Sequence, residues 1–150
     1  MKVSVIGMGY VGLSNAVLLS LKNNVVCHDI DASKLECINK RVSPIKDSLI
    51  TSYFKNEKLK LTTSDYIDNE IAMSDFVLIA TPTDFNAKKN IFNTSSIDVI
   101  LKKLNSLKSS ACIVIKSTLP IGYTKNLKYI FLLNFFVKVG LCMTIFILPE

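Results

Sequence analysis

The sequence predicts an α/β fold, a doubly wound parallel sheet in one domain, and three observations support this. Strand-like runs alternate with segments of helical apolar spacing along the 150 residues. Residues 76–81 are almost continuously apolar, as expected of a strand buried on both faces of a parallel sheet. A glycine-rich turn follows the first strand at once and opens a helix, which is typical of doubly wound folds.

The chain begins with a strand, a turn, a helix and a second strand. Lys2–Ile6 is a short β-branched run, and residues 25–29 form a similar apolar run, so both predict strands. Between them, residues 10–22 carry apolar side chains at helical spacing, such as Val11 and Leu18 seven positions apart. Together these elements form the first half of a βαβ unit.

The middle of the chain predicts shorter elements. Residues 31–40 form a helix that Asp31 or Ser33 is able to cap. It ends before Pro44, because the residue preceding a proline avoids the helical region. Three further elements are expected from shorter runs: a helix over 47–56, a weak strand over 58–62 and a short helix over 65–73.

The second half is organised around two buried strands, expected over residues 76–81 and 111–116. A polar loop over 82–94 and an amphipathic helix over 95–107 connect them. The apolar stripe of that helix consists of Ile97, Ile100, Leu101 and Leu104. A turn over 117–122 follows, and a further helix is expected to start near Tyr123.

Gly7, Gly9 and Gly12 form a G-x-G-x-x-G pattern, which is weak evidence alone but stronger between a strand and a helix. Gly7 permits a tight turn, Gly9 lets the backbone approach a pyrophosphate, and Gly12 lets the helix pack close to the strand. The helix N-terminus offers unpaired N–H groups and a partial positive charge to phosphates. The turn therefore predicts a dinucleotide site.

Asp29 ends the second strand, 22 residues after Gly7. A carboxylate there accepts hydrogen bonds from a ribose diol and repels a 2′-phosphate, which favours NAD over NADP. The alternative is a structural turn with a helix-capping aspartate. Asp31 competes for the ribose role but is better placed as the cap, and His28 is expected to be a packed or edge residue.

Two more strand ends are expected to contribute to the same site. In a doubly wound sheet, ligands lie beyond the carboxyl ends of the strands, where the strand order reverses. Thr83 and Thr118 follow the strands over 76–81 and 111–116, so their hydroxyls are expected to face a nicotinamide. The alternative is that both threonines are turn formers beside Pro82 and Pro120.

Five segments resemble the N-terminal part of the UDP-glucose 6-dehydrogenases, within the UDP-glucose and GDP-mannose dehydrogenase family. They are GMGYVGL at 7–13, RVSPIKD at 41–47, ATPTD at 80–84, NIFNTSS at 90–96 and KSTLPIGYT at 116–124. Their order and spacing match the family over residues 1–128. The resemblance implies a Rossmann-like NAD-binding domain and the oxidation of the C6 alcohol of UDP-glucose to a carboxylate, with two NAD and a water.

The resemblance also implies roles for individual residues. Positions matching Val11, Asp29, Lys34, Thr83 and Thr118 touch NAD in that family, and Thr118 also matches a threonine thought to help hold the catalytic water. From its place in the sequence alone, Lys34 is equally compatible with solvent exposure. The expected cofactor-binding set is Gly7, Gly9, Tyr10, Val11, Gly12, Asp29, Lys34, Thr83 and Thr118.

Family members are much longer, and the resemblance places their nucleophilic cysteine, with its assisting lysine, asparagine and aspartate, outside the matching residues. Cys27, Cys37, Cys112 and Cys142 match none of those positions. We therefore expect an NAD-binding domain over 1–128, truncated before the central helix and sugar-binding domain, that binds NAD without catalysis. The alternatives are a non-catalytic nucleotide-binding or interaction module, or a sibling dehydrogenase acting on UDP-N-acetylmannosamine or GDP-mannose.

Residues 129–150 form an apolar segment of uncertain origin. Sixteen of the twenty residues at 129–148 are apolar. Three interpretations remain: a frameshift product, a diverged helix over 129–137 with a last strand over 141–148, or a membrane anchor. Lys138 in the middle of the segment, with Asn134, argues against the anchor.

Composition excludes several other functions. The net charge is +6, but Arg41 is the only arginine and the lysines are scattered, so no nucleic-acid partner is expected. The four cysteines show no metal-like spacing, so no metal is expected, and a reduced cytoplasmic protein fits best. A homodimer is expected only for the full-length enzymes of the family.

Overall fold

The computed structural model describes residues 1–86, 91–126 and 130–132. Its main sheet has six strands, all paired in parallel. The strands are β1 (Lys2–Ile6), β2 (Asn24–His28), β3 (Leu61–Ser64), β4 (Phe76–Ile79), β7 (Cys112–Ile115) and β8 (Ile130–Leu132). Their order in the sheet is β3-β2-β1-β4-β7-β8. The order reverses between β1 and β4, which confirms the doubly wound prediction and places the expected ligand crevice there.

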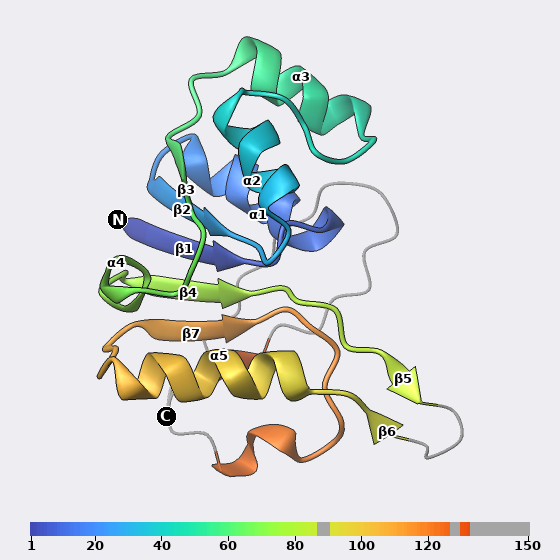
Figure 1. The fold of residues 1–150 in the computed structure, drawn as a ribbon, viewed down its shortest axis with the longest axis vertical. Coiled ribbons are helices and arrows are strands. Elements are labelled where there is room, and N and C mark those ends of the chain that lie inside the picture. The colour runs from blue at the N-terminus through green and yellow to red at the C-terminus, as the bar shows by residue number, and fades with distance from the viewer. Residues whose placement is uncertain (87–90, 127–129, 133–150) are drawn as a thin grey trace.

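Helices lie on both sides of this sheet (Figure 1). They are α1 (Tyr10–Ser20), α2 (Ala32–Asn39), α3 (Ser48–Asn56), α4 (Asn69–Ala72) and α5 (Ser95–Ser106). Successive residues of β4 belong to two separate cores, since Leu78 packs with residues of α1, α2 and α3 whereas Val77 and Ile79 pack with residues of α4 and α5. The apolar run of β4 is therefore buried on both faces, as its sequence predicts.

Aspartates fix where three of the helices begin. The side chains of Asp31, Asp47 and Asp68 accept hydrogen bonds from backbone N–H groups in the first turns of α2, α3 and α4. Of the two predicted caps of α2, Asp31 therefore takes the role. In contrast, α1 begins directly after Gly9, which has no side chain to cap the helix, and its first turn contains no acidic residue.

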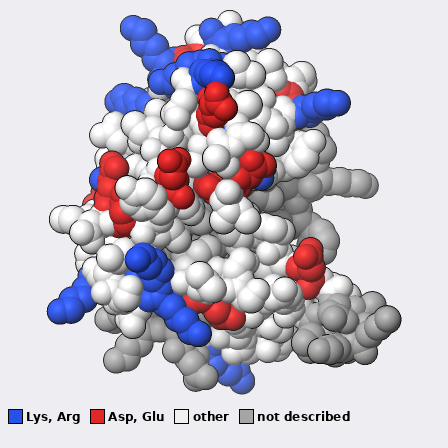
Figure 2. All heavy atoms as spheres, viewed as in Figure 1, with Lys and Arg blue, Asp and Glu red and all other residues white. Residues whose placement is uncertain are grey.

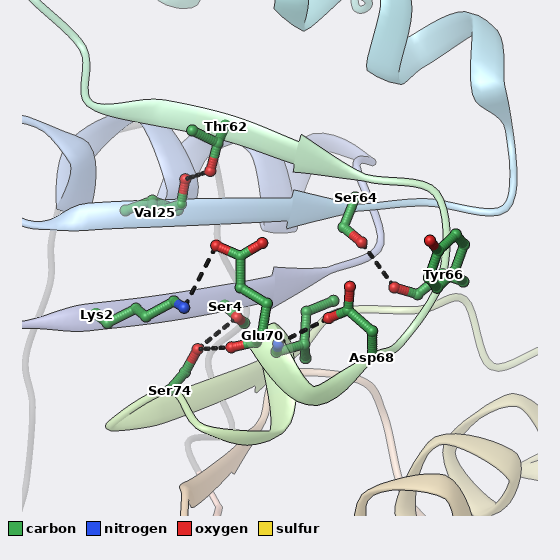
Figure 3. A network of polar contacts seen from close by, with 10 residues as sticks. Lys2, Ser4, Val25, Thr62, Ser64, Tyr66, Asp68, Glu70 and Ser74 are labelled. Atoms are coloured by element: carbon green, nitrogen blue, oxygen red, sulfur yellow. Dashed lines mark hydrogen bonds and ion pairs between the residues drawn. The ribbon is translucent and has the colours of Figure 1, made fainter.

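The short helix α4 is fastened to β1 by polar contacts (Figure 3). The buried hydroxyls of Ser4 and Ser74 lie 2.7 Å apart. Lys2 Nζ lies 3.3 Å from Glu70 Oε1 at the surface above them. A buried hydroxyl pair satisfies both side chains, so this end of the sheet is anchored through specific contacts as well as through packing.

Some elements differ from the sequence prediction. The strand expected over 58–62 is β3, at Leu61–Ser64, because its register is set by β2, where Val25 pairs with Leu61. The loop expected over 82–94 contains a small antiparallel pair, β5 (Phe85–Asn86) and β6 (Ile91–Phe92). The ring centroids of Phe85 and Phe92 lie 5.0 Å apart, and this aromatic contact stabilises the pair of strands within an otherwise polar loop.

The end of the described chain also differs. The helix expected near Tyr123 is one short 3₁₀ turn, Tyr123–Asn126. Residues 130–132, expected to be helical in one interpretation, form β8, because β7 offers a free strand edge and β8 pairs with it. The strand expected over 141–148 lies outside the described residues, and the domain boundary at residue 128 stays a prediction. Among the helices of the described residues, none is long and apolar enough to cross a membrane.

Candidate functional site

Two of the glycines between β1 and the first turn of α1, Gly7 and Gly12, admit no side chain. Gly7 has a φ of +97°, and a Cβ on it would lie 2.7 Å from the carbonyl oxygen of Ala80. A Cβ on Gly12 would lie 1.7 Å from the carbonyl oxygen of Gly7. The turn therefore packs closely against the end of β4, and α1 packs closely against the turn. Gly7 and Gly12 permit these two contacts, as predicted.

Gly9 has different surroundings. A Cβ on Gly9 would meet no atom within 4 Å, so the backbone faces open space at the start of α1. The first backbone bond of the helix runs from Leu13 N–H to the Gly9 carbonyl, which leaves the N–H groups of the first turn available. Tyr10 and Val11 lie in that turn with exposed side chains. A phosphate group fits this position, because it fills the space a Cβ would fill and accepts those N–H groups.

Asp29 joins the glycine turn to the second strand. The Asp29 carboxylate is buried, and its Oδ2 accepts a 2.6 Å hydrogen bond from Met8 N–H, inside the turn. Its Oδ1 accepts a 2.9 Å bond from Asp31 N–H. The position of Asp29 in the sequence predicts the ribose role but does not reveal this bond to the turn. The strand register is what would have predicted the bond, because Ile6 pairs with His28 and residue 29 therefore lies beside the turn that follows Ile6.

Lys34 lies beside this carboxylate. Its Nζ is 3.1 Å from Asp29 Oδ2, and about a third of the side chain is exposed. A carboxylate has roughly four lone-pair positions, of which Asp29 uses three, so Oδ1 keeps capacity for one further donor. Asp31 is turned to its own helix: its bonds from Ser33 lower the pKa of the Asp31 carboxyl, as expected of a helix cap.

The loops after β4 and β7 adjoin the glycine turn and each other. Gly7 lies against the backbone of Ala80 and Thr81. The buried Ser117 donates a 2.6 Å hydrogen bond to the Thr81 carbonyl. Thr83 is partly buried and Thr118 is exposed, each just beyond these contacts. The structure therefore brings the three predicted loops together at one edge of the sheet.

Two further titratable side chains, His28 and Cys27, lie within the core. His28 is buried and its Nδ1 lies 2.8 Å from the Ser64 carbonyl, which confirms it as a packed residue. Burial raises the pKa of the Cys27 thiol to about 12, so this thiol is not a nucleophile at neutral pH. The described residues contain no group of three His, Cys, Asp or Glu side chains that could hold a metal ion.

A hollow of about 360 Å³ lies elsewhere, toward the amino ends of β1, β2 and β3, and is lined in part by Lys2, Lys60 and Glu70. It does not include the glycine turn or the neighbouring strand-end loops. Lysines and acids are interspersed on the face shown in Figure 2, so no continuous basic surface covers it.

Taken together, the strand order, the glycine turn and the acid at the end of β2 define a dinucleotide-binding domain. Residues 1–150 match the family model described as the NAD binding domain of the UDP-glucose/GDP-mannose dehydrogenase family, and the chain belongs to that family. It is therefore an NAD-binding domain, as the glycine turn and Asp29 together predict.

Relatives and solved structures agree with this assignment. The chain is 45% identical over 130 residues to UDP-glucose 6-dehydrogenase of Campylobacter jejuni, covering 85% of this chain and 33% of that protein. It is 41% identical over 128 residues to the enzyme of that name from Streptococcus pneumoniae, with 85% and 32% covered. The chain thus spans about a third of the length of these curated relatives.

Among solved structures, the UDP-D-ManNAc dehydrogenase of Pyrococcus horikoshii gives a TM-score of 0.70 at 25% identity, covering 83% of this chain and 30% of that one. GDP-mannose dehydrogenase of Pseudomonas aeruginosa gives 0.73 at 22% identity, with 84% and 30% covered. The second likeness is one of fold alone. Both share the fold of the described sheet.

Proposed function

We propose that this chain is the NAD-binding part of a UDP-glucose 6-dehydrogenase, and that the 150-residue chain binds NAD without oxidising the sugar. The observation that carries the proposal is an open Gly9, beside the reversal of the strand order, together with a buried Asp29 at the end of the neighbouring strand β2. The choice of UDP-glucose over other nucleotide sugars rests on the relatives at 45% and 41% identity.

In this proposal the two ends of NAD are held by different residues. The pyrophosphate is bound by the glycine turn, with Gly7, Gly9 and Gly12, and by the first turn of α1, with Tyr10 and Val11. Asp29 Oδ1 accepts a hydrogen bond from a ribose hydroxyl, and the negative charge of this carboxylate repels a 2′-phosphate. Lys34 stays beside Asp29 at the adenosine end, where its ion pair fixes the carboxylate.

Thr83 and Thr118 are proposed to hold the nicotinamide end, from the loops after β4 and β7. When bound, NAD supplies the acceptor for a hydride from the substrate alcohol. Thr118, which is exposed, is additionally proposed to hold the water of the second oxidation step. None of the cysteines of this chain is assigned the nucleophile's role, and the burial and raised pKa of Cys27 support that choice for Cys27.

The test of this proposal compares binding with turnover. Purified chain is mixed with NAD and UDP-glucose, and the absorbance of the reduced nicotinamide is followed over time. We expect no NADH above a protein-free control, together with NAD binding in a parallel titration. Clear turnover by the chain alone would contradict the proposal, as would a lack of NAD binding.

A further inference from the structure

The loops that carry Thr83 and Thr118 are tied together by hydroxyl groups. Ser117 Oγ donates to the Thr81 carbonyl at 2.6 Å. The Thr81 hydroxyl lies 3.1 Å from the Ser96 hydroxyl, which in turn donates to the Pro82 carbonyl at 3.3 Å. Ser117, Thr81 and Ser96, which we call the hydroxyl clamp, thus connect the end of β7, the end of β4 and the start of α5.

A second brace holds the far side of the Thr118 loop. The Tyr123 hydroxyl donates to Asp98 Oδ1, and the Thr94 hydroxyl lies 3.1 Å from Asp98 Oδ2. Both partners belong to the first part of α5 or its cap. The segment from Ser117 to Tyr123 is therefore anchored at both ends. Ser117 is bonded to the loop after β4, and Tyr123 is bonded to α5, which follows that loop.

We propose that the hydroxyl clamp is a set of positioning residues that fixes the separation of the Thr83 and Thr118 loops, and thereby the binding of the nicotinamide half of NAD. This inference rests on the proposed function. Thr118 follows Ser117 directly, and Thr83 lies two residues beyond Thr81, so a change in the clamp displaces both threonines. Removal of the Ser117 hydroxyl leaves the Thr81 carbonyl without that donor and loosens one loop from the other.

The adenosine half is held by separate contacts. The bonds of Asp29 to Met8 N–H and Asp31 N–H involve none of the clamp residues. The clamp meets the glycine turn where Gly7 lies against Ala80 and Thr81, and the Ala80 N–H is itself bonded to the Ile6 carbonyl of β1. A substitution at Ser117 is therefore expected to affect the nicotinamide end and to leave the adenosine end intact.

The experiment measures dissociation constants by calorimetry for NAD and for ADP-ribose, which lacks the nicotinamide. We expect Ser117→Ala to weaken NAD binding by about three- to tenfold and to change ADP-ribose binding less than about twofold. Ser109→Ala is the matched control, because Ser109 Oγ donates an equally short 2.6 Å bond to the Ala72 carbonyl at the opposite end of the sheet. This control should leave both constants unchanged.

Ser96→Ala provides an independent variant if Ser117→Ala does not fold, with Ser106→Ala, at the last residue of α5, as its control. Equal weakening of both ligands, no weakening of either, or equal affinity of the unsubstituted chain for NAD and ADP-ribose would each overturn the inference. A failure of the unsubstituted chain to bind either ligand would instead overturn the proposed function. Selective loss of NAD affinity in a clamp variant supports the inference.

Discussion

Gly9 and Gly12 lie three residues apart in one turn, yet substitution is expected to affect them differently. Gly9→Ala places a methyl group in open space, so we expect the free energy of unfolding to change by at most about 1 kcal/mol. The same methyl group occupies the proposed phosphate position, so NAD affinity should fall about tenfold or more. Chemical denaturation and calorimetric titration measure the two effects.

Gly12→Ala is the contrasting variant. Its methyl group would lie 1.7 Å from the Gly7 carbonyl oxygen, so the turn has to move and the protein is expected to lose several kcal/mol of stability, on the order of 3 kcal/mol or more. A Gly9→Ala protein that binds NAD normally would exclude the phosphate role of this turn. A Gly12→Ala protein with unchanged stability would contradict the packing described for α1.

Asp29→Ala is expected to abolish the rise in melting temperature that NAD produces. The variant also leaves the buried Met8 N–H without its acceptor, which costs about 1–3 kcal/mol. Both effects appear in thermal unfolding with and without NAD, as a lower melting temperature and a lost ligand shift. Asp31→Ala is the control: it removes the cap of α2, but the NAD shift should remain. An NAD shift in Asp29→Ala equal to that of the unsubstituted chain would remove the ribose assignment.

The residue types of the site could be predicted from the sequence, but their contacts could not. The spacing of Gly7, Gly9 and Gly12 between a strand and a helix indicates the turn, and the place of Asp29 after the second strand indicates an acid beside it. The bond from Met8 N–H to Asp29 depends on strand register, which local patterns do not fix. The clamp residues Thr81, Ser96 and Ser117 carry no pattern of their own, because single hydroxyls are common in loops.

At the scale of elements, the segment after β7 is held to α5 through Tyr123. Burial, and then the hydrogen bond and charge of Asp98, raise the pKa of the Tyr123 hydroxyl from 10.0 to about 12. The folded state therefore keeps the phenol protonated when the unfolded chain has lost the proton, and stability falls as the pH rises through 10 to 12. Tyr123 contributes fully below pH 10.

Tyr123→Phe is expected to lower the melting temperature at neutral pH, because the bond to Asp98 is lost. The difference between the two proteins should shrink as the pH rises from 10 to 12, since the substituted chain has no proton to lose at this position. Melting curves measured in parallel at several pH values test this. A difference that stays constant over this range would contradict the pH-linked contribution of the Tyr123 hydroxyl.

Elements with strong periodicity or continuous apolar runs could be predicted closely, and marginal ones could not. The bounds of β1 match, and α5 and β7 lie within the predicted ranges, because their residues pack on well-defined core faces. By contrast, β3 is shifted because its position depends on pairing with β2. The pair of β5 and β6 has only two residues per strand and rests on the contact between Phe85 and Phe92, which a polar loop composition conceals.

For the whole molecule, alternation of strand and helix predicts the parallel sheet and the two helix layers, and the structure confirms both. The sheet gathers three loops that are far apart in sequence, because parallel strands place their carboxyl ends at one edge. The apolar composition of 129–150 could not be converted to a fold, since an apolar run of that length suits a helix, a strand or a membrane segment. Its described part, β8, pairs with β7.

The central claim is that this chain alone forms an NAD site, and calorimetric titration of the purified 150-residue protein with NAD tests it most directly. We expect a saturable signal that fits one NAD per chain. Binding should also raise the melting temperature with NAD concentration, because a ligand that binds only the folded state stabilises it, by about 2.7 kcal/mol at one hundred times the dissociation constant. A titration of properly folded protein without saturable heat would contradict the account.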